Sequence, residues 1–439
     1  ILQGIAESRR WPVHAAFVDF QKAFDSVDWR ALESILRGWR VPAKLLVAIF
    51  AIMRDHQLKV KMPDGSFTEC ITVCCGVLQG DTLAPLLFIT ALDSVLRKLP
   101  YARGLRIGEL HLPNLAYADD IILLASTQDD LQHLFTSLET SALEIGLRLN
   151  LGKGKTEETA FGTAIPTVSI TTNTGLHLTQ TTAYKYLGVF MDVERDTSQR
   201  FGKAWGAIHS MDPIWRNPLV DVGAKRRLFV ALVEPILSYG LCAWPLTKTR
   251  RAMLDGRFSR MLRYCLRMPS WDHGDTHIHT ETVYGDTPFL STMVTTRVLS
   301  LIGHAIRAHI AQRTYHPLVN VLLWEENIPK RQGGQKLTVP KILFSLLNIE
   351  YPEQLRDLAL HKAAWRTTIR SIGERLQETK YTEILAARKK RGHCADTTQL
   401  ADIMPKPKKS PTTTASKTSK EGRRHKVGAL WGAWKEDGR

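Results

Sequence analysis

The sequence predicts an α+β domain, in which a small antiparallel sheet is backed by helices, followed by a region that is almost entirely helical. Short apolar runs with the alternation of β-strands are interspersed with helical periodicity up to about residue 192. From about residue 198 to residue 310, apolar side chains recur almost wholly at helical spacing. With 439 residues, 44% of them hydrophobic and 23% charged, the chain has enough apolar side chains for two or three cores.

The first predicted elements are a strand, two helices and a hairpin. Residues 15–20 form a short apolar run, which indicates a strand. Asp25 or Ser26 can cap a helix whose apolar residues follow at helical spacing, and Pro42 opens a second helix. Residues 58–73 alternate around a Pro-Asp-Gly turn, and this pattern predicts a β-hairpin.

The rest of this domain continues the alternation of helix and strand. Residues 82–99 predict a helix with Pro85 in its first turn, where a missing N–H group is harmless. Apolar residues flank Asp119 and Asp120 on both sides, which predicts a hairpin with both carboxylates at its tip. An amphipathic helix and a short strand are predicted at residues 128–145 and 186–189.

In the helical region, one helix is expected to kink at Pro235. Another, over residues 250–268, places Arg260, Arg263 and Arg267 on one face, at positions i, i+3 and i+7. Such a face is either an ordinary solvated surface or a contact with a nucleic-acid backbone, and the spacing alone fits both interpretations equally.

These patterns divide the chain into four regions: the α+β domain (residues 1–192), a helical region (193–312), a second helical region (313–400) and a basic tail (401–439). The tail is rich in Pro, Ser, Thr, Lys and Arg, which predicts disorder. Between residues 380 and 426, 13 Lys or Arg stand against four Asp or Glu, so this segment carries most of the net charge of +16. Such basicity indicates a polyanionic partner, or a localisation signal.

The cysteines and the apolar runs indicate an intracellular protein without a membrane partner. Six cysteines without paired CxxC units favour reduced thiols over a disulfide framework. Cys265 with His273, His277 and His279 is a weak zinc candidate, and surface histidines are the better interpretation. Apolar runs are far shorter than the roughly 20 residues that span a bilayer. Residues 1–8 resemble a helix already in progress, so we expect a fragment that lacks its N-terminal part.

Three aspartates are the candidates for chemistry. Asp119 and Asp120 lie side by side at the tip of an apolar hairpin, and Asp19 lies at the end of another strand. Carboxylates that are close together repel one another unless a cation compensates them. Mg²⁺ takes oxygen ligands from one or two carboxylates and from substrate phosphates, and a pair of such ions supports in-line phosphoryl transfer. A turn or a helix cap is the usual reason for a lone Asp-Asp pair. Whether this pair has a catalytic role therefore depends on the motifs that accompany it.

Five motifs occur in order along the chain. Residues 16–27 read AFVDFQKAFDSV, residues 76–88 read GVLQGDTLAPLLF, and residues 117–120 read YADD. Residues 146–157 and 186–188 supply the fourth and the fifth. Together they resemble the reverse transcriptases of non-LTR retrotransposons. Looser matches follow at residues 235–244, 297–307 and 364–366, so that the resemblance covers most of residues 10–370.

The resemblance implies a polymerase palm in residues 1–192, with the fingers largely missing, and a thumb and connection in residues 193–312. The implied activity is RNA-directed DNA polymerisation with two Mg²⁺ ions, for which Mn²⁺ could substitute. Implied partners are an element RNA template, a DNA primer or target, and deoxynucleoside triphosphates. The family acts in the nucleus after assembly with its RNA in the cytoplasm.

The resemblance also implies roles for single residues. The metal ligands would be Asp19, Asp119 and Asp120, with backbone from Val18 and Phe20 nearby. The nucleotide pocket would be formed by Phe24, Gln79, Gly80 and Tyr117, with the ring of Phe24 excluding a 2′-hydroxyl. Lys155 would assist departure of pyrophosphate, with Lys153 as its rival, and the three arginines of residues 250–268 would contact nucleic acid.

Two alternatives stay open. A group II intron maturase has similar palm motifs, although the segments around Tyr239-Gly240 and Gly303-His304 favour the retrotransposon family. The chain could also be a decayed or domesticated element that binds RNA or DNA without catalysis. The intact aspartates count against decay.

Overall fold

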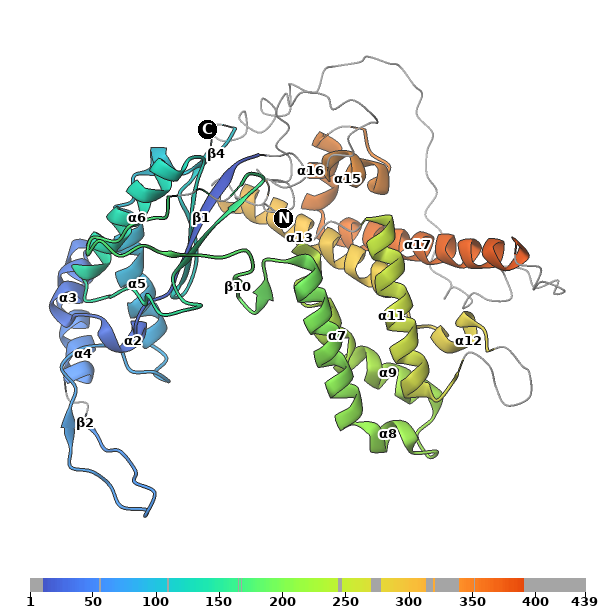
Figure 1. The fold of residues 1–439 in the computed structure, drawn as a ribbon, viewed down its shortest axis with the longest axis horizontal. Coiled ribbons are helices and arrows are strands. Elements are labelled where there is room, and N and C mark those ends of the chain that lie inside the picture. Colours follow the sequence, from blue (N-terminus) through green and yellow to red (C-terminus); the bar gives the residue numbers. More distant parts are fainter. Residues whose placement is uncertain are drawn as a thin grey trace. The chain divides into compact units, whose positions relative to one another are not determined.

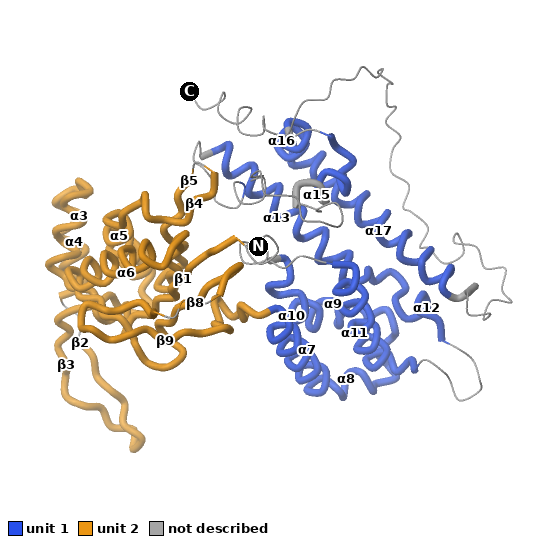
Figure 2. Tube along the Cα trace, turned by 45° about the horizontal axis from the view of Figure 1, so that its top comes forward, with its two compact units in different colours: residues 1, 193–439 blue, residues 2–192 orange. Residues whose placement is uncertain are grey.

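A computed structural model describes residues 11–54, 57–108, 110–164, 166, 168–243, 247–269, 278–312, 319, 339–350 and 352–390. The chain divides into two compact units, Leu2–Asp192 and Val193–Arg439, and each is described by itself (Figure 2). The expectations for residues 1–8, for the tail and for the zinc candidates His273 and His277 lie outside the described residues. None of the helices in the described ranges is long and apolar enough to cross a membrane.

A five-stranded sheet is the centre of the first unit, with the strand order β6-β7-β1-β8-β9. Its central strand, β1, is labelled in Figure 1. Strand β1 (Val13–Val18) is flanked by β7 (Asp120–Ala125) and β8 (Glu157–Phe161), both antiparallel to it. The edges are β6 (Asn114–Tyr117) and β9 (Thr179–Gln180). All six residues of β1 are buried, as expected for a central strand covered on both faces.

Helices cover this sheet and complete the core. Helix α6 (Gln128–Leu143) packs on β1 and β7, and α5 (Ala84–Leu96) packs between α6 and α3 (Trp29–Gly38). Helices α2 (Ala23–Ser26) and α4 (Ala43–Arg54) complete the set. Pro85 lies in the first turn of α5, as the sequence predicts. An α+β architecture is thereby confirmed for this unit.

The cap of α3 differs from the prediction. Asp25 and Ser26 lie within the short helix α2, and the N-cap of α3 is Asp28. Its carboxylate accepts hydrogen bonds from the backbone N–H groups of Arg30 (2.9 Å) and Ala31 (2.8 Å). The prediction was wrong by two or three residues because Asp25, Ser26 and Asp28 are all capping-type residues, and only the last leaves room for α2.

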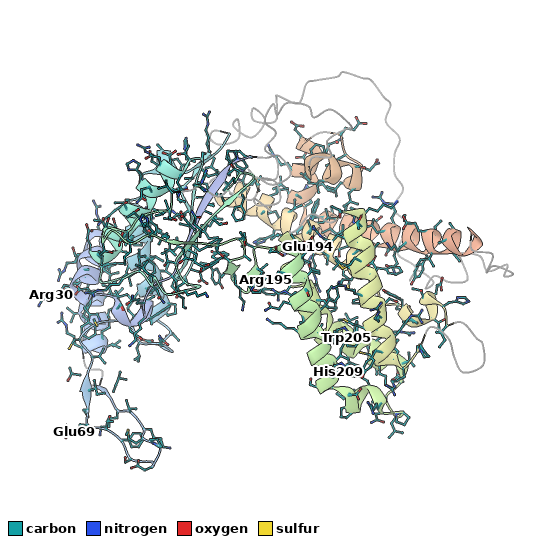
Figure 3. The ribbon with its side chains drawn as sticks, in the orientation of Figure 1. Arg30, Glu69, Glu194, Arg195, Trp205 and His209 are labelled. Carbon is teal, nitrogen blue, oxygen red and sulfur yellow. The ribbon has the colours of Figure 1, made fainter. Side chains whose placement is uncertain are left out.

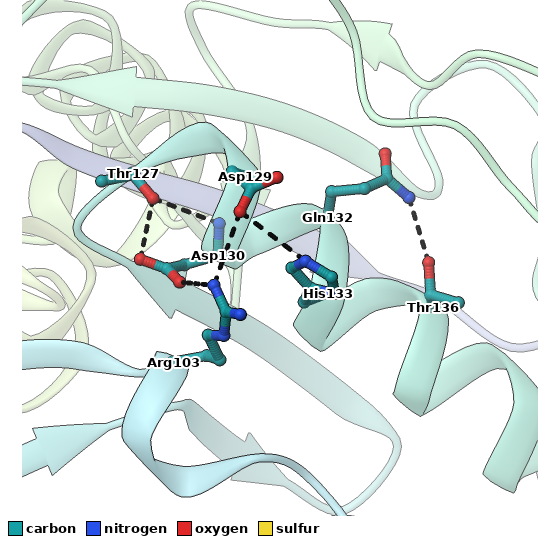
Figure 4. Close-up of polar contacts among 7 residues, drawn as sticks. All are labelled: Arg103, Thr127, Asp129, Asp130, Gln132, His133 and Thr136. Atoms are coloured by element: carbon teal, nitrogen blue, oxygen red, sulfur yellow. Dashed lines mark hydrogen bonds and ion pairs between the residues drawn. The ribbon is translucent and has the colours of Figure 1, made fainter.

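The start of α6 is held by a polar cluster that Figure 4 shows in detail. The Thr127 hydroxyl caps the helix by accepting from the Asp130 N–H group (3.1 Å) and donates to the Asp130 carboxylate (2.8 Å). Arg103, from the short 3₁₀ helix Tyr101–Arg103, donates to the same carboxylate (2.8 Å). Because β7 leads directly into α6, these contacts fix the end of the strand that begins with Asp120.

The hairpins of the first unit agree with the sequence in part. Strands β2 (Gln57–Leu58) and β3 (Ile71–Thr72) form the predicted hairpin. Residues 186–189 are not one strand: they belong to a second hairpin of β10 (Lys185–Tyr186) and β11 (Val189–Phe190). Leu187 (φ 46°) and Gly188 (φ 77°) both have positive φ at its turn, which matches the twist of the flanking strands. A further hairpin, β4 (Leu105–Ile107) with β5 (Leu110–Leu112), was not predicted.

The secondary-structure elements described in the second unit are all helices, as the sequence predicts. Its elements are α7 (Val193–Ser210), α8 (Asp212–Arg216), α9 (Val222–Leu232), α10 (Glu234–Ser238), the 3₁₀ helix Leu241–Ala243, α11 (Lys248–Leu266), α12 (Thr280–Tyr284), α13 (Leu290–Gln312), α15 (Val339–Leu347), α16 (Pro352–Leu360) and α17 (Lys362–Lys390). Pro235 does not kink one helix. It lies in the first turn of α10, separate from α9, because the ring of proline cannot be accommodated within a continuing helix.

Candidate active site

Strand register brings Asp19 and Asp120 together. Val18 of β1 pairs with Ile121 of β7, so the next position along each strand places Asp19 opposite Asp120. Directly opposite residues of an antiparallel pair project from the same face, with Cα atoms roughly 4.5 to 5.5 Å apart. All three aspartates, Asp19, Asp119 and Asp120, are partly exposed, and we call them the three-aspartate site.

Asp119 lies in the tight turn between β6 and β7. Tyr117 pairs with Asp120, which leaves Ala118 and Asp119 as the two turn residues. Ala118 has a φ of 52°, a backbone conformation that costs a residue with a Cβ atom roughly 1 to 2 kcal/mol. Such strain persists where the surrounding structure imposes it, and it occurs often at functional sites.

The electrostatics of the site show a concentration of negative charge. Burial raises the pKa of the Asp120 carboxyl group, and the nearby carboxylates of Asp119 and Asp19 raise it further. Lys155 opposes this shift by stabilising the charged form. A site in which neighbouring carboxylates raise the pKa of one carboxyl group favours the binding of a cation.

Asp19 is held by residues that come from the segment before β8. Its Oδ2 atom accepts a hydrogen bond from the Asn150 side-chain amide (2.8 Å) and lies 3.6 Å from the Lys155 Nζ atom. The Asn150 backbone N–H donates to the Asp19 carbonyl (2.8 Å), and the Asp19 N–H donates to the Thr156 hydroxyl (3.2 Å). Of the two rival lysines, Lys155 therefore has the contact with an aspartate, and no ion pair of Lys153 is found among the described residues.

Two tyrosines donate hydrogen bonds to backbone carbonyls of the site. The Tyr184 hydroxyl donates to the Lys155 carbonyl (2.8 Å), and its ring stacks on Phe17 with centroids 4.0 Å apart. The Tyr186 hydroxyl donates to the Asp120 carbonyl (3.4 Å). Burial, followed by the negative charges of the site, raises the pKa of each tyrosine to about 12, so both hydroxyls remain donors at neutral pH.

Of the expected nucleotide-binding residues, Phe24 lies against the loop that leads to Gln79 and Gly80. Phe24 is half-buried and stacks on Phe88 (centroids 4.4 Å apart). The loop at Gly76 docks against it, because the Val77 N–H donates to the Phe24 carbonyl (2.7 Å). A Cβ atom at Gly76 would lie 2.6 Å from the Asp25 carbonyl oxygen, so this close approach requires glycine.

The remaining expected residues differ in exposure. Gln79 and Gly80, in the loop that follows Gly76, are exposed, and Gly80 has a φ of 96°. Tyr117 is 68% exposed. The side chains of Val18 and Phe20 are buried, so only their backbone groups could face a ligand.

Sequence reasoning missed three residues that shape the site. Asn150 and Thr156 lie within the fourth motif, but no role was assigned to either. Tyr184 lies two residues before the fifth motif, and nothing in its local sequence signals a contact with Lys155. Their common feature is a contact that spans from 29 to 137 residues of chain, which no short motif encodes.

The donor set fits a hard divalent cation. Three carboxylates offer only oxygen atoms, the ligand type that Mg²⁺ and Mn²⁺ prefer. Within the described ranges, no three acidic, histidine or cysteine side chains are already grouped as a metal centre. For zinc the fit is poor: Cys265 is fully buried, and burial raises the pKa of its thiol to about 12, which disfavours the thiolate ligand.

Comparisons with known proteins identify a family for the residues of the first unit. Residues 3–191 match the family model described as reverse transcriptase (RNA-dependent DNA polymerase). These residues are a reverse transcriptase domain. The three-aspartate site lies wholly inside it, and the described helical unit lies outside the matched residues.

Relatives of the reverse transcriptase domain come from non-LTR retrotransposons. The Pol polyprotein of the type-1 retrotransposable element R2 of Nasonia vitripennis is 34% identical over 137 residues, which are 31% of this chain and 13% of that protein. The probable RNA-directed DNA polymerase from transposon BS of Drosophila melanogaster is 26% identical over 288 residues, which are 61% of this chain and 31% of that protein. The matched stretches thus span less than a third of either relative.

Among solved structures, telomerase from Candida tropicalis aligns over 66% of this chain and 47% of its own, with 14% identity and a TM-score of 0.32. The assignment of the reverse transcriptase domain rests on the family model and the retrotransposon relatives.

Proposed function

We propose that the chain is the RNA-directed DNA polymerase of a non-LTR retrotransposon, which copies element RNA into DNA from a DNA primer. In this proposal the first unit is the palm and residues 193–312 form the thumb and connection. The observation that carries the proposal is the strand register that sets Asp19 opposite Asp120, with Asp119 in the adjoining turn. The retrotransposon relatives favour this proposal over a maturase.

The three-aspartate site would hold two Mg²⁺ ions, for which Mn²⁺ could substitute. Bound there, the ions would activate the primer 3′-hydroxyl and stabilise the leaving pyrophosphate. Asn150 and Thr156 would orient Asp19 for this task through their hydrogen bonds. Lys155, 3.6 Å from Asp19, is placed to neutralise charge or give a proton as pyrophosphate leaves.

The nucleotide side of the site would select deoxynucleotides. The Phe24 ring is fixed by stacking on Phe88, so it would present a rigid wall under the incoming sugar. A rigid wall discriminates by size, because a 2′-hydroxyl would need space that the ring occupies. Gln79 and Gly80 would approach the nucleotide from the exposed loop beside it, and Tyr117 from the end of β6.

The test is primer extension by the full chain on an RNA template with deoxynucleotides and Mg²⁺. Asp119→Ala and Asp120→Ala are each expected to lower the rate by about a thousandfold, since a lost ligand removes several kcal/mol of charge stabilisation. Asp129→Ala is the matched control, because it removes a carboxylate that is 77% exposed in the same unit. Unchanged extension in both site variants, with the melting temperature preserved, would refute the proposal.

The second candidate is a chain that binds nucleic acid without catalysis, which the net charge of +16 supports. It predicts RNA binding equal to that of active enzymes but no metal-dependent extension by the unaltered chain. The same assay, run beside a filter-binding measurement, separates the two candidates.

A further inference from the structure

A pocket of about 680 Å³ lies on the helical unit, and we call it the arginine pocket. Its lining includes Trp205 of α7 and, from α11 and the residue after it, Ser259, Arg260, Arg263, Tyr264 and Arg267. Its volume lies within the roughly 300 to 1,000 Å³ typical of small-ligand sites. Among the residues that the structure describes, the lining contains three arginines and no carboxylate, so an anionic ligand is favoured.

One wall of the pocket is aromatic and held in place. Trp205 and His209 lie one turn apart on α7 (Figure 3), with their rings stacked at 5.6 Å. The Tyr264 ring meets both edge-on, 5.4 Å from Trp205 and 5.5 Å from His209. The Tyr264 hydroxyl also lies 3.3 Å from an Asp212 carboxylate oxygen, to which it donates. Trp205 is only half-buried, so part of its ring system remains available to a flat ligand.

The three arginines are not equivalent. Arg263 is half-buried and donates to the backbone carbonyls of Pro269 (3.2 Å) and Ile278 (3.0 Å). Arg260 and Arg267 are exposed, and neither guanidinium has a hydrogen bond or an ion pair with the part of the chain that the structure describes. Arg263 therefore holds the end of α11 in place, while Arg260 and Arg267 remain able to bind a phosphate group.

Arg267 has an unusual backbone. It is the C-cap of α11 with φ 58° and ψ 36°, the left-handed conformation in which glycine or asparagine is normally found. An arginine at such a position is unfavourable for stability, so the long cationic side chain is expected to have a use that offsets this cost. Arg267 also lines the pocket, so its backbone conformation and its position both indicate a role for this side chain in binding.

We propose that the arginine pocket binds an unpaired nucleotide of a single-stranded nucleic acid, with its phosphate on Arg260 and Arg267 and its base against Trp205 and Tyr264. A duplex backbone would use the cations but not the aromatic wall, since paired bases are stacked inside the helix. Single strands expose base faces, and stacking on aromatic side chains is how proteins bind them without sequence preference. The proposal needs neither metal nor polymerisation, so it goes beyond the proposed function.

The experiment is fluorescence anisotropy of the full chain, in EDTA, with labelled oligouridine, oligothymidine of equal length, and a blunt duplex. Arg267→Gly with Arg260→Ala is expected to weaken binding of the single strands by about tenfold and to reduce the salt slope by roughly 1 to 2. Arg267→Gly alone should not lower the melting temperature, because glycine suits the left-handed C-cap. The oligouridine and oligothymidine arms distinguish RNA from DNA as the source of the nucleotide.

The aromatic wall is tested by Trp205→Leu against Trp205→Phe, because only phenylalanine retains a ring for stacking. Trp205→Leu is expected to weaken single-strand binding by about tenfold, and Trp205→Phe by much less. Arg370→Ala is the matched charge control, since it removes an exposed arginine of α17 from outside the pocket. Photocrosslinking with iodouridine should label a peptide that contains Trp205 or Tyr264.

Three results would overturn the proposal. Equal loss of duplex and single-strand binding would mean a contact with phosphates alone. An equal affinity for polyglutamate would mean a general anion site, because that polymer has no bases. Losses no greater than that of Arg370→Ala would mean that the pocket does not bind nucleic acid. Since EDTA prevents polymerisation in every arm, failure of the polymerase proposal would leave these measurements unaffected.

Discussion

The three-aspartate site and the arginine pocket position their side chains by different means. Asp19 and Asp120 are placed by the register of two central strands, and a slip of one residue would turn each to the opposite face. In the pocket, Trp205 and Tyr264 come from two helices, and only the packing of those helices sets their distance. The first arrangement depends on backbone hydrogen bonds, and the second on side-chain contacts.

The two regions also differ in charge and hence in what they bind. The first gathers carboxylates that raise the pKa of Asp120 and require a cation, while the second gathers guanidinium groups that require an anion. Changes in one region should therefore leave the ligand of the other unaffected. Oligouridine binding by the lysine variants of the first region tests that independence.

After the loss of Asp119 or Asp120, the next largest effect is expected for Lys155→Ala in primer extension. The Lys155 Nζ atom lies 3.6 Å from Asp19, and loss of a proton donor or counter-charge at the leaving group typically costs about a hundredfold or more in rate. Lys153→Ala removes the same charge two residues away and should have little effect. Single-turnover extension rates measure both, with oligouridine binding as the second readout.

Two results would contradict this assignment. Equal losses for Lys153→Ala and Lys155→Ala would mean that the segment contributes only general positive charge. Weaker oligouridine binding by Lys155→Ala would mean that the two regions share a ligand, which would contradict their independence.

The predictions from sequence agree best with the structure where a feature depends on residues that are close together in the chain. The apolar arms around Asp119 and Asp120 predict their hairpin because alternating burial and a two-residue turn are both local properties. The predicted cap at Asp25 or Ser26 and the predicted single strand at residues 186–189 were wrong, because several adjacent residues could serve each role. Boundaries of this kind are settled by packing.

Contacts between distant residues could not be predicted. Arg263 is predicted to share a helix face with Arg260, yet its guanidinium donates to the carbonyl of Ile278, 15 residues further along the chain. No local sequence feature indicates that the Tyr264 ring, 59 residues later, packs edge-on against Trp205. A helical periodicity indicates which residues share a face, but not which partner that face meets.

A smaller effect is expected for Phe24→Val. The ring is fixed on Phe88 at 4.4 Å, and a shorter side chain would leave space for a 2′-hydroxyl. Incorporation of ribonucleotides relative to deoxynucleotides should rise about tenfold, the usual consequence of changing the size of a pocket by a few carbon atoms. Competition assays with mixed nucleotides measure the ratio. Phe88→Leu, which leaves Phe24 in place, should change it less; the reverse order would mean that Phe24 is not the wall.

The smallest effect is expected for Tyr184→Phe, which tests how far backbone support alone matters in the three-aspartate site. Phenylalanine keeps the stack on Phe17 but loses the 2.8 Å hydrogen bond to the Lys155 carbonyl, so the free energy of unfolding should fall by about 1 kcal/mol. Extension should fall only a few-fold, since Lys155 keeps its charge. Tyr186→Phe loses a longer bond, 3.4 Å, and should cost less in both measurements. If Tyr186→Phe were the more harmful change, support of the Asp120 carbonyl would matter more than support of Lys155, and the order of importance within the site would be reversed.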